Sequence, residues 1–308
     1  MKKIVTLILL ILSFEAAAFD KPCSKQYSLI AFSDKDDKVL LQTRADIIVY
    51  PASLVKLMTL YLTFEAIEEK KISADDFLTV SQRGEEISKV NKNNTMRLKE
   101  GDKITVREAI RAVIVKSFNE AAVTLAEAVG KDEWHFVRMM NAKAMQLGMI
   151  NSSFRNASGL HEEGQYTTAY DLARLTKAIK KDFPGYYHLF ALKEFTYKGT
   201  KYETHNHVLK DYIGAEGLKT GFTNASGFNL ISAAKKKDER VISILLGCET
   251  SVGRDDFTKE ILDDSFEKLA SKDSKTAVKI APKFVYKFSK GEGKKEVIDD
   301  KELEQIGN

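Results

Sequence analysis

The chain has 308 residues, 44% of them hydrophobic and 30% charged, so it can bury a sizeable core and is not an intrinsically disordered protein. Its formal net charge of +4 comes from interleaved acidic and basic residues, which gives no indication of nucleic-acid binding. The only cysteines, Cys23 and Cys248, exclude a scaffold of several disulfides and a metal site built from several thiolates.

The first residues have the composition of a secretory signal peptide. Lys2 and Lys3 precede an apolar run over residues 4–12, and a short stretch of alanines ends at Ala18. We expect cleavage after Ala18 and export of the chain. The alternative is an uncleaved membrane anchor, which the length of the run disfavours, because a spanning helix needs roughly 20 apolar residues.

Export makes a disulfide between the two cysteines possible. Cys23 lies just before the first predicted strand, residues 27–32, and Cys248 lies just after the last one, residues 240–246. If these strands are antiparallel neighbours, the start and the end of the fold meet there. A disulfide and two free thiols are equally open, because a bridge needs a geometry that sequence does not show.

A hairpin followed by helices is predicted for the first two thirds of the chain. Residues 27–32 and 38–42 are strand-like and flank a charged turn. Pro51 suits the first turn of a helix, and Thr105 with Glu108 resembles the capping box of another. The predicted helices cover residues 51–68, a stretch from about 102, and residues 121–129, 133–147 and 168–179.

The last third returns to strands. Strand patterns cover residues 194–197, 217–223, 228–234 and 240–246, and a helix over 255–269 follows. Two strands at the start, three near the end and helices between them predict an α/β fold of the α+β type, with a mainly antiparallel five-stranded sheet flanked by helices. We expect one domain over 19–270, which includes a mostly helical subdomain at about 75–165.

Residues 271–308 form a short tail that is rich in lysine as far as Lys295. This tail is either solvated or in contact with an anionic surface. Residues 299–308 lack a strong apolar face, so no stable membrane anchor is predicted there.

A Ser-x-x-Lys motif at Ser53 and Lys56 falls in the first predicted helix. Residues three apart on a helix share a face, so Lys56 reaches the Ser53 hydroxyl and becomes its base if burial or a nearby cation, for which Lys219 is the candidate, keeps the amine neutral. The Ser53 N–H, in the first turn, is available to hold an oxyanion. The motif is weak alone, because Ser265 to Lys268 also matches it and resembles a solvated helix face.

A Ser-x-Asn motif lies between two predicted helices. Ser117 is placed to pass a proton between Lys56 and a leaving nitrogen, and Asn119 to donate to Lys56 or to a substrate carbonyl. Helix capping is the alternative role for this pair.

A Lys-Thr-Gly motif, Lys219, Thr220 and Gly221, falls inside a strand pattern. A lysine and a threonine on an edge strand can hold a carboxylate while the strand pairs with an extended peptide, and glycine permits close approach of another backbone. The Phe222 N–H would then be the second oxyanion donor. The alternative is an ordinary basic edge strand.

In order and spacing, the three motifs resemble those of low-molecular-mass penicillin-binding proteins, specifically D-alanyl-D-alanine carboxypeptidases. The resemblance extends over about residues 27–269. It is most evident in residues 50–59, 140–144, 147–149, 159–169 and 217–227.

The resemblance implies serine acyl transfer on peptidoglycan. Ser53 attacks the bond between the two D-alanines that end a stem peptide, the terminal D-alanine leaves, and water releases the acyl-enzyme. The other roles are those of base (Lys56), relay and support (Ser117 and Asn119), and carboxylate clamp (Lys219 and Thr220). Penicillins and other β-lactams are covalent inhibitors, and neither metal nor organic cofactor is needed. We expect a soluble periplasmic enzyme.

Several positions depart from the family pattern. Phe118 stands where relatives usually have a small residue and Glu120 where aspartate is frequent, which puts the geometry of the relay in question. Relatives commonly carry an arginine beside Asn206. Here either His205 or His207 takes its place, or these are ordinary surface histidines.

Three other functions share parts of this pattern. A DD-endopeptidase uses the same site on peptidoglycan crosslinks. A serine β-lactamase needs a positioned carboxylate, and residues 151–160 offer none in a Glu-x-x-x-Asn arrangement. A non-catalytic peptidoglycan-binding protein would keep the fold without needing Ser53, Lys56 and Lys219.

Overall fold

The computed structural model describes residues 23, 26–90 and 94–271, and the backbone of two strands beyond them, β10 (Val285–Phe288) and β11 (Lys295–Ile298). The predicted signal peptide and most of the lysine-rich tail lie outside the described residues. Within the described part of the chain, no helix has the length and apolar character needed to cross a bilayer.

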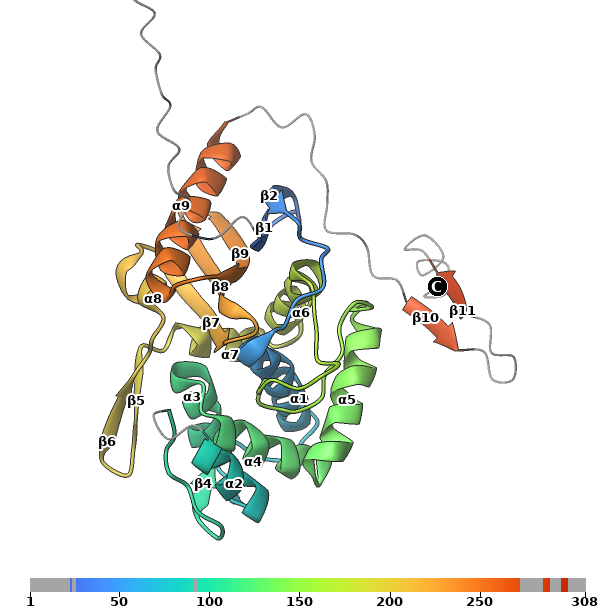
Figure 1. The fold of residues 1–308 in the computed structure, drawn as a ribbon, viewed down its shortest axis with the longest axis vertical. Coiled ribbons are helices and arrows are strands. Elements are labelled where there is room, and N and C mark those ends of the chain that lie inside the picture. Colours follow the sequence, from blue (N-terminus) through green and yellow to red (C-terminus); the bar gives the residue numbers. More distant parts are fainter. Residues whose placement is uncertain (1–22, 24–25, 91–93, 272–284, 289–294, 299–308) are drawn as a thin grey trace, which may run out of the picture.

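A five-stranded antiparallel sheet in the order β2-β1-β9-β8-β7 forms the centre of the fold (Figure 1). Its strands are β1 (Ser28–Ser33), β2 (Val39–Thr43), β7 (Ala215–Thr223), β8 (Gly227–Lys236) and β9 (Glu239–Cys248). The predicted sheet is therefore confirmed, with the first hairpin beside the last strand: Ile30 of β1 is paired with Ile244 of β9.

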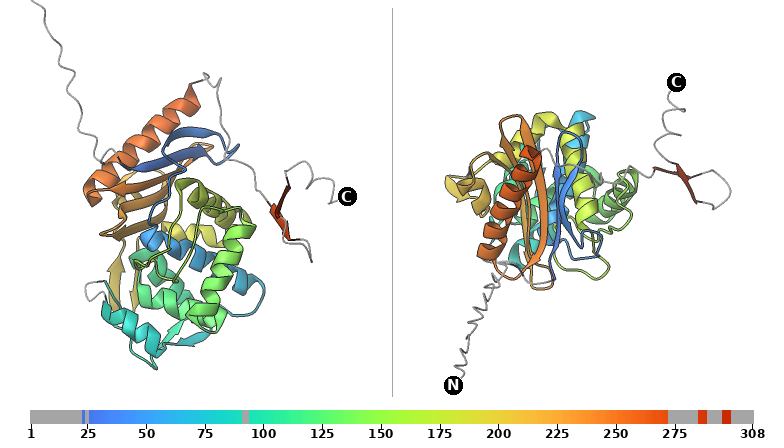
Figure 2. Two further views of the ribbon diagram at one scale, coloured as in Figure 1. Left: turned by 45° about the vertical axis from the view of Figure 1, so that its right-hand side comes forward. Right: turned by 90° about the horizontal axis from the view of Figure 1, so that it is seen from above.

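The two faces of the sheet pack against different layers. In β1, Leu29 and Ala31 belong to the core formed with α9 (Ser251–Ala270), whereas Ile30 and Phe32 belong to the larger core formed with the other helices. This alternation is what the period of two along a strand requires. Figure 2 shows the sheet between α9 and that larger group of helices.

The larger group is built around α1 (Lys56–Glu68), which is buried on nearly all sides and follows a short 3₁₀ turn, η1 (Ala52–Val55). The other long helices are α2 (Gln82–Val90), α3 (Val106–Lys116), α4 (Asn119–Gly130), α5 (Glu133–Gln146) and α6 (Ala169–Asp182). Helices α2 to α4 lie at the end of the molecule away from α9 (Figure 1). This is the region predicted as a helical subdomain.

Short elements complete the fold. Two hairpins pair β3 (Phe77–Thr79) with β4 (Lys103–Thr105) and β5 (Glu194–Tyr197) with β6 (Thr200–Glu203). Further turns of helix are α7 (Pro184–Tyr187), η2 (His188–Ala191) and α8 (His207–Asp211).

Helix starts follow the local capping signals. Thr105 and Glu108 form the predicted capping box of α3, with Thr105 accepting from the Glu108 N–H and Glu108 from the Thr105 N–H. The prediction for α9 was wrong at its start: the helix begins at Ser251 rather than at residue 255, because Thr250 caps it by accepting from the Gly253 N–H.

Cys23 and Cys248 form a disulfide, which decides between the two states that the sequence left open. Cys248 ends β9, and Cys23 precedes β1, the strand paired with β9. The bridge therefore joins the two chain segments that meet in the middle of the sheet.

Candidate active site

Ser53 lies in η1 and Lys56 begins α1, so the two side chains share a face. Nζ of Lys56 lies 3.1 Å from Oγ of Ser53 and donates to Oδ1 of Asn119 at 2.7 Å and to the Ser158 carbonyl. These last two oxygens only accept, so they take both N–H groups of a neutral amine and leave its lone pair for the Ser53 hydroxyl. The expected direction of one bond is corrected: Asn119 accepts from Lys56 rather than donating to it.

The surroundings favour a neutral Lys56. Burial lowers the pKa of Lys56 well below its ordinary value, the charge of Lys219 lowers it further, and Glu120 acts in the opposite direction. Lys219 is also buried, and this burial, followed by the charge of Arg254, lowers its pKa to about 7. Burial and the nearby cation Lys219, the two causes expected from the sequence, both act on Lys56, and burial has the larger effect.

Ser117 stands at the turn between α3 and α4. It is the C-cap of α3, in the left-handed region with φ 62°. Its hydroxyl is buried and has no hydrogen-bond partner among the described residues. Because no hydrogen bond among the described residues holds that oxygen, its place depends on the backbone of the turn.

The side chains at the two departures beside Ser117 make their packing and hydrogen-bond contacts with the core and with a neighbouring loop. Phe118 is buried and packs edge-to-face on Tyr202, with the ring centroids 5.2 Å apart. Glu120 is buried and accepts from the Thr95 hydroxyl and the Met96 N–H, both at 2.6 Å. The larger side chains at these positions therefore serve the core and a neighbouring loop.

The Lys-Thr-Gly motif lies on β7, the edge strand of the sheet, next to η1. A Cβ on Gly221 would lie 3.2 Å from the Ser53 nitrogen and 3.3 Å from the Leu54 nitrogen. Such contacts are tighter than most real ones, so glycine lets the strand come this close to the serine.

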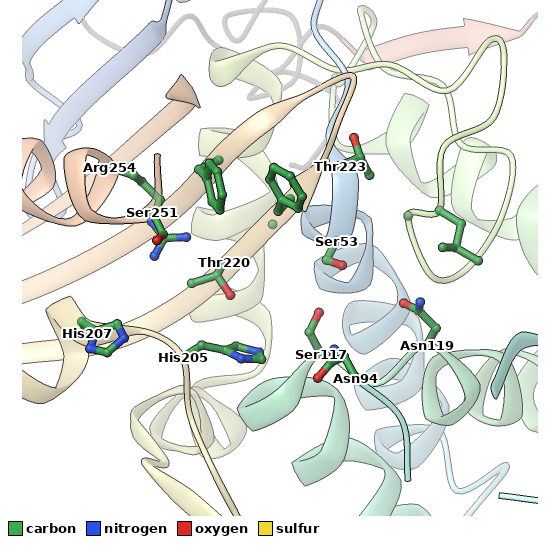
Figure 3. A pocket seen from close by; sticks show the side chains of 15 residues that line it. Ser53, Asn94, Ser117, Asn119, His205, His207, Thr220, Thr223, Ser251 and Arg254 are labelled. Carbon is green, nitrogen blue, oxygen red and sulfur yellow. The ribbon is translucent and has the colours of Figure 1, made fainter. Parts of the chain in front are cut away.

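A cavity of about 360 Å³ opens at this junction (Figure 3). Its polar lining consists of Ser53, Asn94, Ser117, Asn119, His205, His207, Thr220, Thr223, Ser251 and Arg254, and the backbone of Gly221 and Phe222 adjoins them. Ser53, Ser117 and Asn119 point into the same space. Of the predicted site residues, Lys56 and Lys219 are buried behind this lining.

The position of Lys219 corrects one expectation. Its amine donates to the Thr220 carbonyl at 2.9 Å and does not line the cavity, whereas Arg254 does. The buried Arg254 guanidinium is held through Nε and Nη2 by Oδ1 of Asp255. Arg254 was not identified from the sequence. A cation in the first turn of a helix is unfavourable for the helix dipole, so its presence there indicates a role other than stabilising the helix.

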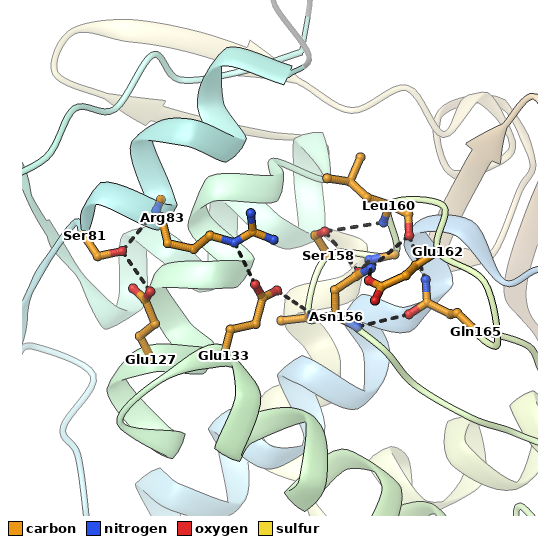
Figure 4. A network of polar contacts seen from close by, with 12 residues as sticks. Ser81, Arg83, Glu127, Glu133, Asn156, Ser158, Leu160, Glu162 and Gln165 are labelled. Atoms are coloured by element: carbon orange, nitrogen blue, oxygen red, sulfur yellow. Dashed lines mark hydrogen bonds and ion pairs between the residues drawn. The ribbon is translucent and has the colours of Figure 1, made fainter.

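The loop that supplies the Ser158 carbonyl was also missed. Glu133 accepts from the Ala157 N–H at 3.0 Å and from Nε of Arg83 at 3.0 Å (Figure 4). Asn156 accepts from the Gly159 N–H at 2.7 Å. Both contacts flank Ser158 and fix its carbonyl. A backbone carbonyl has no side-chain motif by which the sequence could reveal its role.

The second Ser-x-x-Lys match has a different structure. Ser265 is buried in α9 and donates to the Ile261 carbonyl at 2.6 Å, so the interpretation as a solvated face was wrong for this serine. Lys268 donates to the Leu40 carbonyl at 3.0 Å. The two side chains are therefore engaged with backbone on the α9 side of the sheet.

Comparison with known proteins gives the family. The family model described as D-alanyl-D-alanine carboxypeptidase matches residues 16–250. The D-alanyl-D-alanine carboxypeptidase DacD of Salmonella typhimurium is 38% identical over 217 residues, which are 69% of this chain and 55% of that protein. The chain thus spans about half the length of this curated relative.

Two solved structures share the fold. Penicillin binding protein 6B from Escherichia coli is 35% identical with a TM-score of 0.72, covering 77% of this chain and 76% of that one. Penicillin-binding protein D2 from Listeria monocytogenes, in its ampicillin-bound form, is 30% identical with a TM-score of 0.68, covering 78% of this chain and 96% of that one. The chain belongs to the D-alanyl-D-alanine carboxypeptidase family.

Proposed function

We propose that the chain is a serine-type carboxypeptidase that removes the terminal D-alanine from peptidoglycan stem peptides ending in D-Ala-D-Ala. The observation that carries this proposal is the contact of Lys56 with Ser53, Asn119 and Ser158, which leaves the amine lone pair for the serine hydroxyl. The family assignment agrees with it.

The reaction follows from this arrangement. Oγ of Ser53 bonds to the carbonyl carbon between the two D-alanines while Lys56 takes the hydroxyl proton. That proton passes through Ser117 to the leaving nitrogen, the C–N bond breaks, and the terminal D-alanine departs as a free amine. Water then hydrolyses the ester on Ser53. The backbone N–H groups of Ser53 and Phe222 hold the oxyanion.

Substrate binding uses the edge strand and the cationic wall. An extended stem peptide pairs with β7, and its terminal carboxylate meets Thr220 and Arg254, with Lys219 adding positive charge from behind. The proposed catalytic domain is 19–270, with a helical subdomain at about 75–165. No nucleic acid, metal or organic cofactor enters the proposal.

β-Lactams are proposed as inhibitors that acylate Ser53. A relative of 30% identity has a structure in an ampicillin-bound form. The described residues that line the cavity offer hydroxyl, amide, imidazole and guanidinium groups but no carboxylate. This lining favours a long-lived acyl-enzyme over the rapid turnover of a β-lactamase.

The remaining parts of the proposal concern location. The N-terminal sequence supports a signal peptide cleaved after Ala18 and a periplasmic location. Sequencing the N-terminus of the mature protein tests the cleavage, and fractionation tests the compartment.

Mass spectrometry after exposure to penicillin tests the nucleophile. We expect one covalent adduct on Ser53, none on Ser53→Ala, and an undiminished adduct on the control Ser265→Ala, which changes the other Ser-x-x-Lys serine. An adduct that persists in Ser53→Ala would contradict the assignment.

Product analysis tests the substrate. Incubation with a pentapeptide muropeptide should release D-alanine, and Ser53→Ala should release none. Faster cleavage of a crosslinked dimer than of the monomer would instead make the protein an endopeptidase.

A further inference from the structure

The last carbonyl of α3 is held by two side chains from distant segments. Lys116 ends α3, where the final C=O groups have no partner within the helix. Nδ2 of Asn94 lies 3.0 Å from the Lys116 carbonyl oxygen, and Nε2 of His205 lies 3.2 Å from it. Residues 22 and 89 positions away in sequence therefore converge on one oxygen.

The contacts of His205 require a single form of its ring. The Lys116 carbonyl only accepts, so Nε2 of His205 carries the proton. Nδ1 of the same ring lies 3.4 Å from Nζ of Lys116, where an unprotonated nitrogen accepts and a protonated one would meet a cation. The neutral tautomer with its proton on Nε2 satisfies both contacts.

The charges around His205 agree with this form. Burial, followed by the charges of Lys116, Lys219 and Arg254, lowers the pKa of His205 to about 4, and the hydrogen bond to the Lys116 carbonyl acts in the opposite direction. The imidazole is therefore neutral at the pH at which most enzymes work.

Ser117 directly follows Lys116, whose carbonyl Asn94 and His205 hold. Its hydroxyl faces the cavity without a partner, and its backbone has φ 62°, a conformation that costs a non-glycine residue free energy. The peptide unit that joins Lys116 to Ser117 thus sets the position of the Ser117 Cα, from which that hydroxyl extends. Figure 3 shows His205 and Asn94 on either side of this turn.

We propose that His205 is a positioning residue for Ser117, acting together with Asn94 through the Lys116 carbonyl. The inference rests on the proposed function, because it assigns Ser117 to the proton relay. The rival role is direct contact of His205 with substrate, since its ring also lines the cavity. The two roles differ in what they change: positioning affects the rate of acylation, and contact affects the binding of substrate.

Two substitutions of similar size separate these roles. In His205→Gln, the side-chain amide reaches as far as Nε2 and keeps a donor for the Lys116 carbonyl. In His205→Asn, the shorter amide overlies Nδ1 and loses that donor. We expect His205→Asn to lower kcat by about 10- to 100-fold, as a misplaced relay group does, with KM unchanged. His205→Gln should recover most of the rate, and His188→Asn, at an exposed position, is the control.

An increase in KM that is equal in both variants, with kcat retained, would overturn the proposal in favour of substrate contact. A fall in melting temperature of His205→Asn with wild-type kcat would overturn it in favour of a purely structural role.

The tautomer of the His205 ring can be measured without an activity assay. Nitrogen NMR of the wild-type protein should find His205 as the neutral tautomer with its proton on Nε2 at pH 7. The opposite tautomer or an imidazolium would contradict the proposed contacts of His205 with the Lys116 carbonyl and with Nζ of Lys116. If wild-type protein forms no penicillin adduct, the proposed function fails, and the tautomer still decides whether the Lys116 carbonyl is held as described.

Discussion

Both the hydrogen bonds and the electrostatic surroundings of Lys56 favour a neutral amine. The acceptors Asn119 and Ser158 orient the amine, and burial with the charge of Lys219 disfavours its protonation. Removing either influence should change the pH at which Ser53 becomes reactive.

Replacing Lys219 tests the electrical influence. In Lys219→Met, the loss of a neighbouring cation raises the pKa of Lys56, so the rising limb of the acylation rate against pH moves to higher pH. Burial is the larger cause of the lowered pKa of Lys56 and is retained in the variant, so this pKa should rise only part of the way to its ordinary value. Stopped-flow acylation by a fluorescent penicillin measures it, with Lys235→Met, at an exposed position, as control. An unmoved limb would show that Lys219 does not act on the base.

His205 should also affect stability. Its pKa is about 4 when folded and ordinarily 6.5, so between these values the unfolded chain binds more protons. Its contribution is complete above pH 6.5 and is lost as pH falls toward 4, amounting to at most roughly 3 kcal/mol. Urea unfolding at pH 7 and pH 4.5 should show a smaller loss for His205→Gln than for wild type. Equal losses would contradict the shifted pKa.

At the scale of residues, the sequence predicted the contacts between side chains that are close along the chain. Ser53 and Lys56 are three apart on one helical face, so spacing predicts their contact. Ser158 was out of reach because it contributes a backbone carbonyl, which every residue has. Arg254 was missed, and the choice between His205 and His207 stayed open, because the positions of these side chains depend on how distant elements pack.

Among the elements, the loop around Ser158 supplies the backbone carbonyl that accepts from Lys56. Glu133 of α5 holds it by accepting from the Ala157 N–H, and on its outer side contacts Arg83 of α2. The same carboxylate thus joins two helices to the loop that orients Lys56.

Glu133→Ala should leave the Ala157 N–H without this partner and cost about 1–3 kcal/mol of unfolding free energy. It should also slow acylation, because the Ser158 carbonyl is less well placed. Arg83→Ala is the matched control: it removes only the outer, half-exposed ion pair and should cost less than about 1 kcal/mol. Urea unfolding and acylation rates measure both. Equal effects of the two variants would show that the ion pair, and not the loop contact, matters.

Elements with strong periodicity or a capping signal were predictable, and short ones were not. The capping box of Thr105 and Glu108 marked the start of α3 correctly. The three-residue strands β3 and β4 carry too little pattern to be seen in sequence, because they are held by pairing with each other rather than by local preference.

For the whole molecule, the order of strands along the chain was enough to predict the sheet. Among the described residues, the two initial strands and the three strands β7 to β9 pair with one another, and β1 beside β9 completes the sheet. What remained undecided was the disulfide, since bond formation depends on the positions of two atoms rather than on strand order.

Replacing both cysteines by serine should lower the unfolding free energy by about 2–5 kcal/mol, because the bridge restricts the unfolded chain. Thermal unfolding measures the loss, and wild-type protein in reductant should match the variant. The folded variant should keep its acylation rate, since neither cysteine lines the catalytic cavity. Unchanged stability after confirmed loss of the bridge would contradict this account.

The pairing of β1 with β9 also sets an order of events during synthesis. The first hairpin emerges from the ribosome about 200 residues before the strand that covers its inner edge. Until Val241 to Leu246 arrive, that edge has no permanent neighbour, and contacts between such distant segments form slowly. A nascent chain of this protein therefore stays open to chaperones at least until β9 has been synthesised.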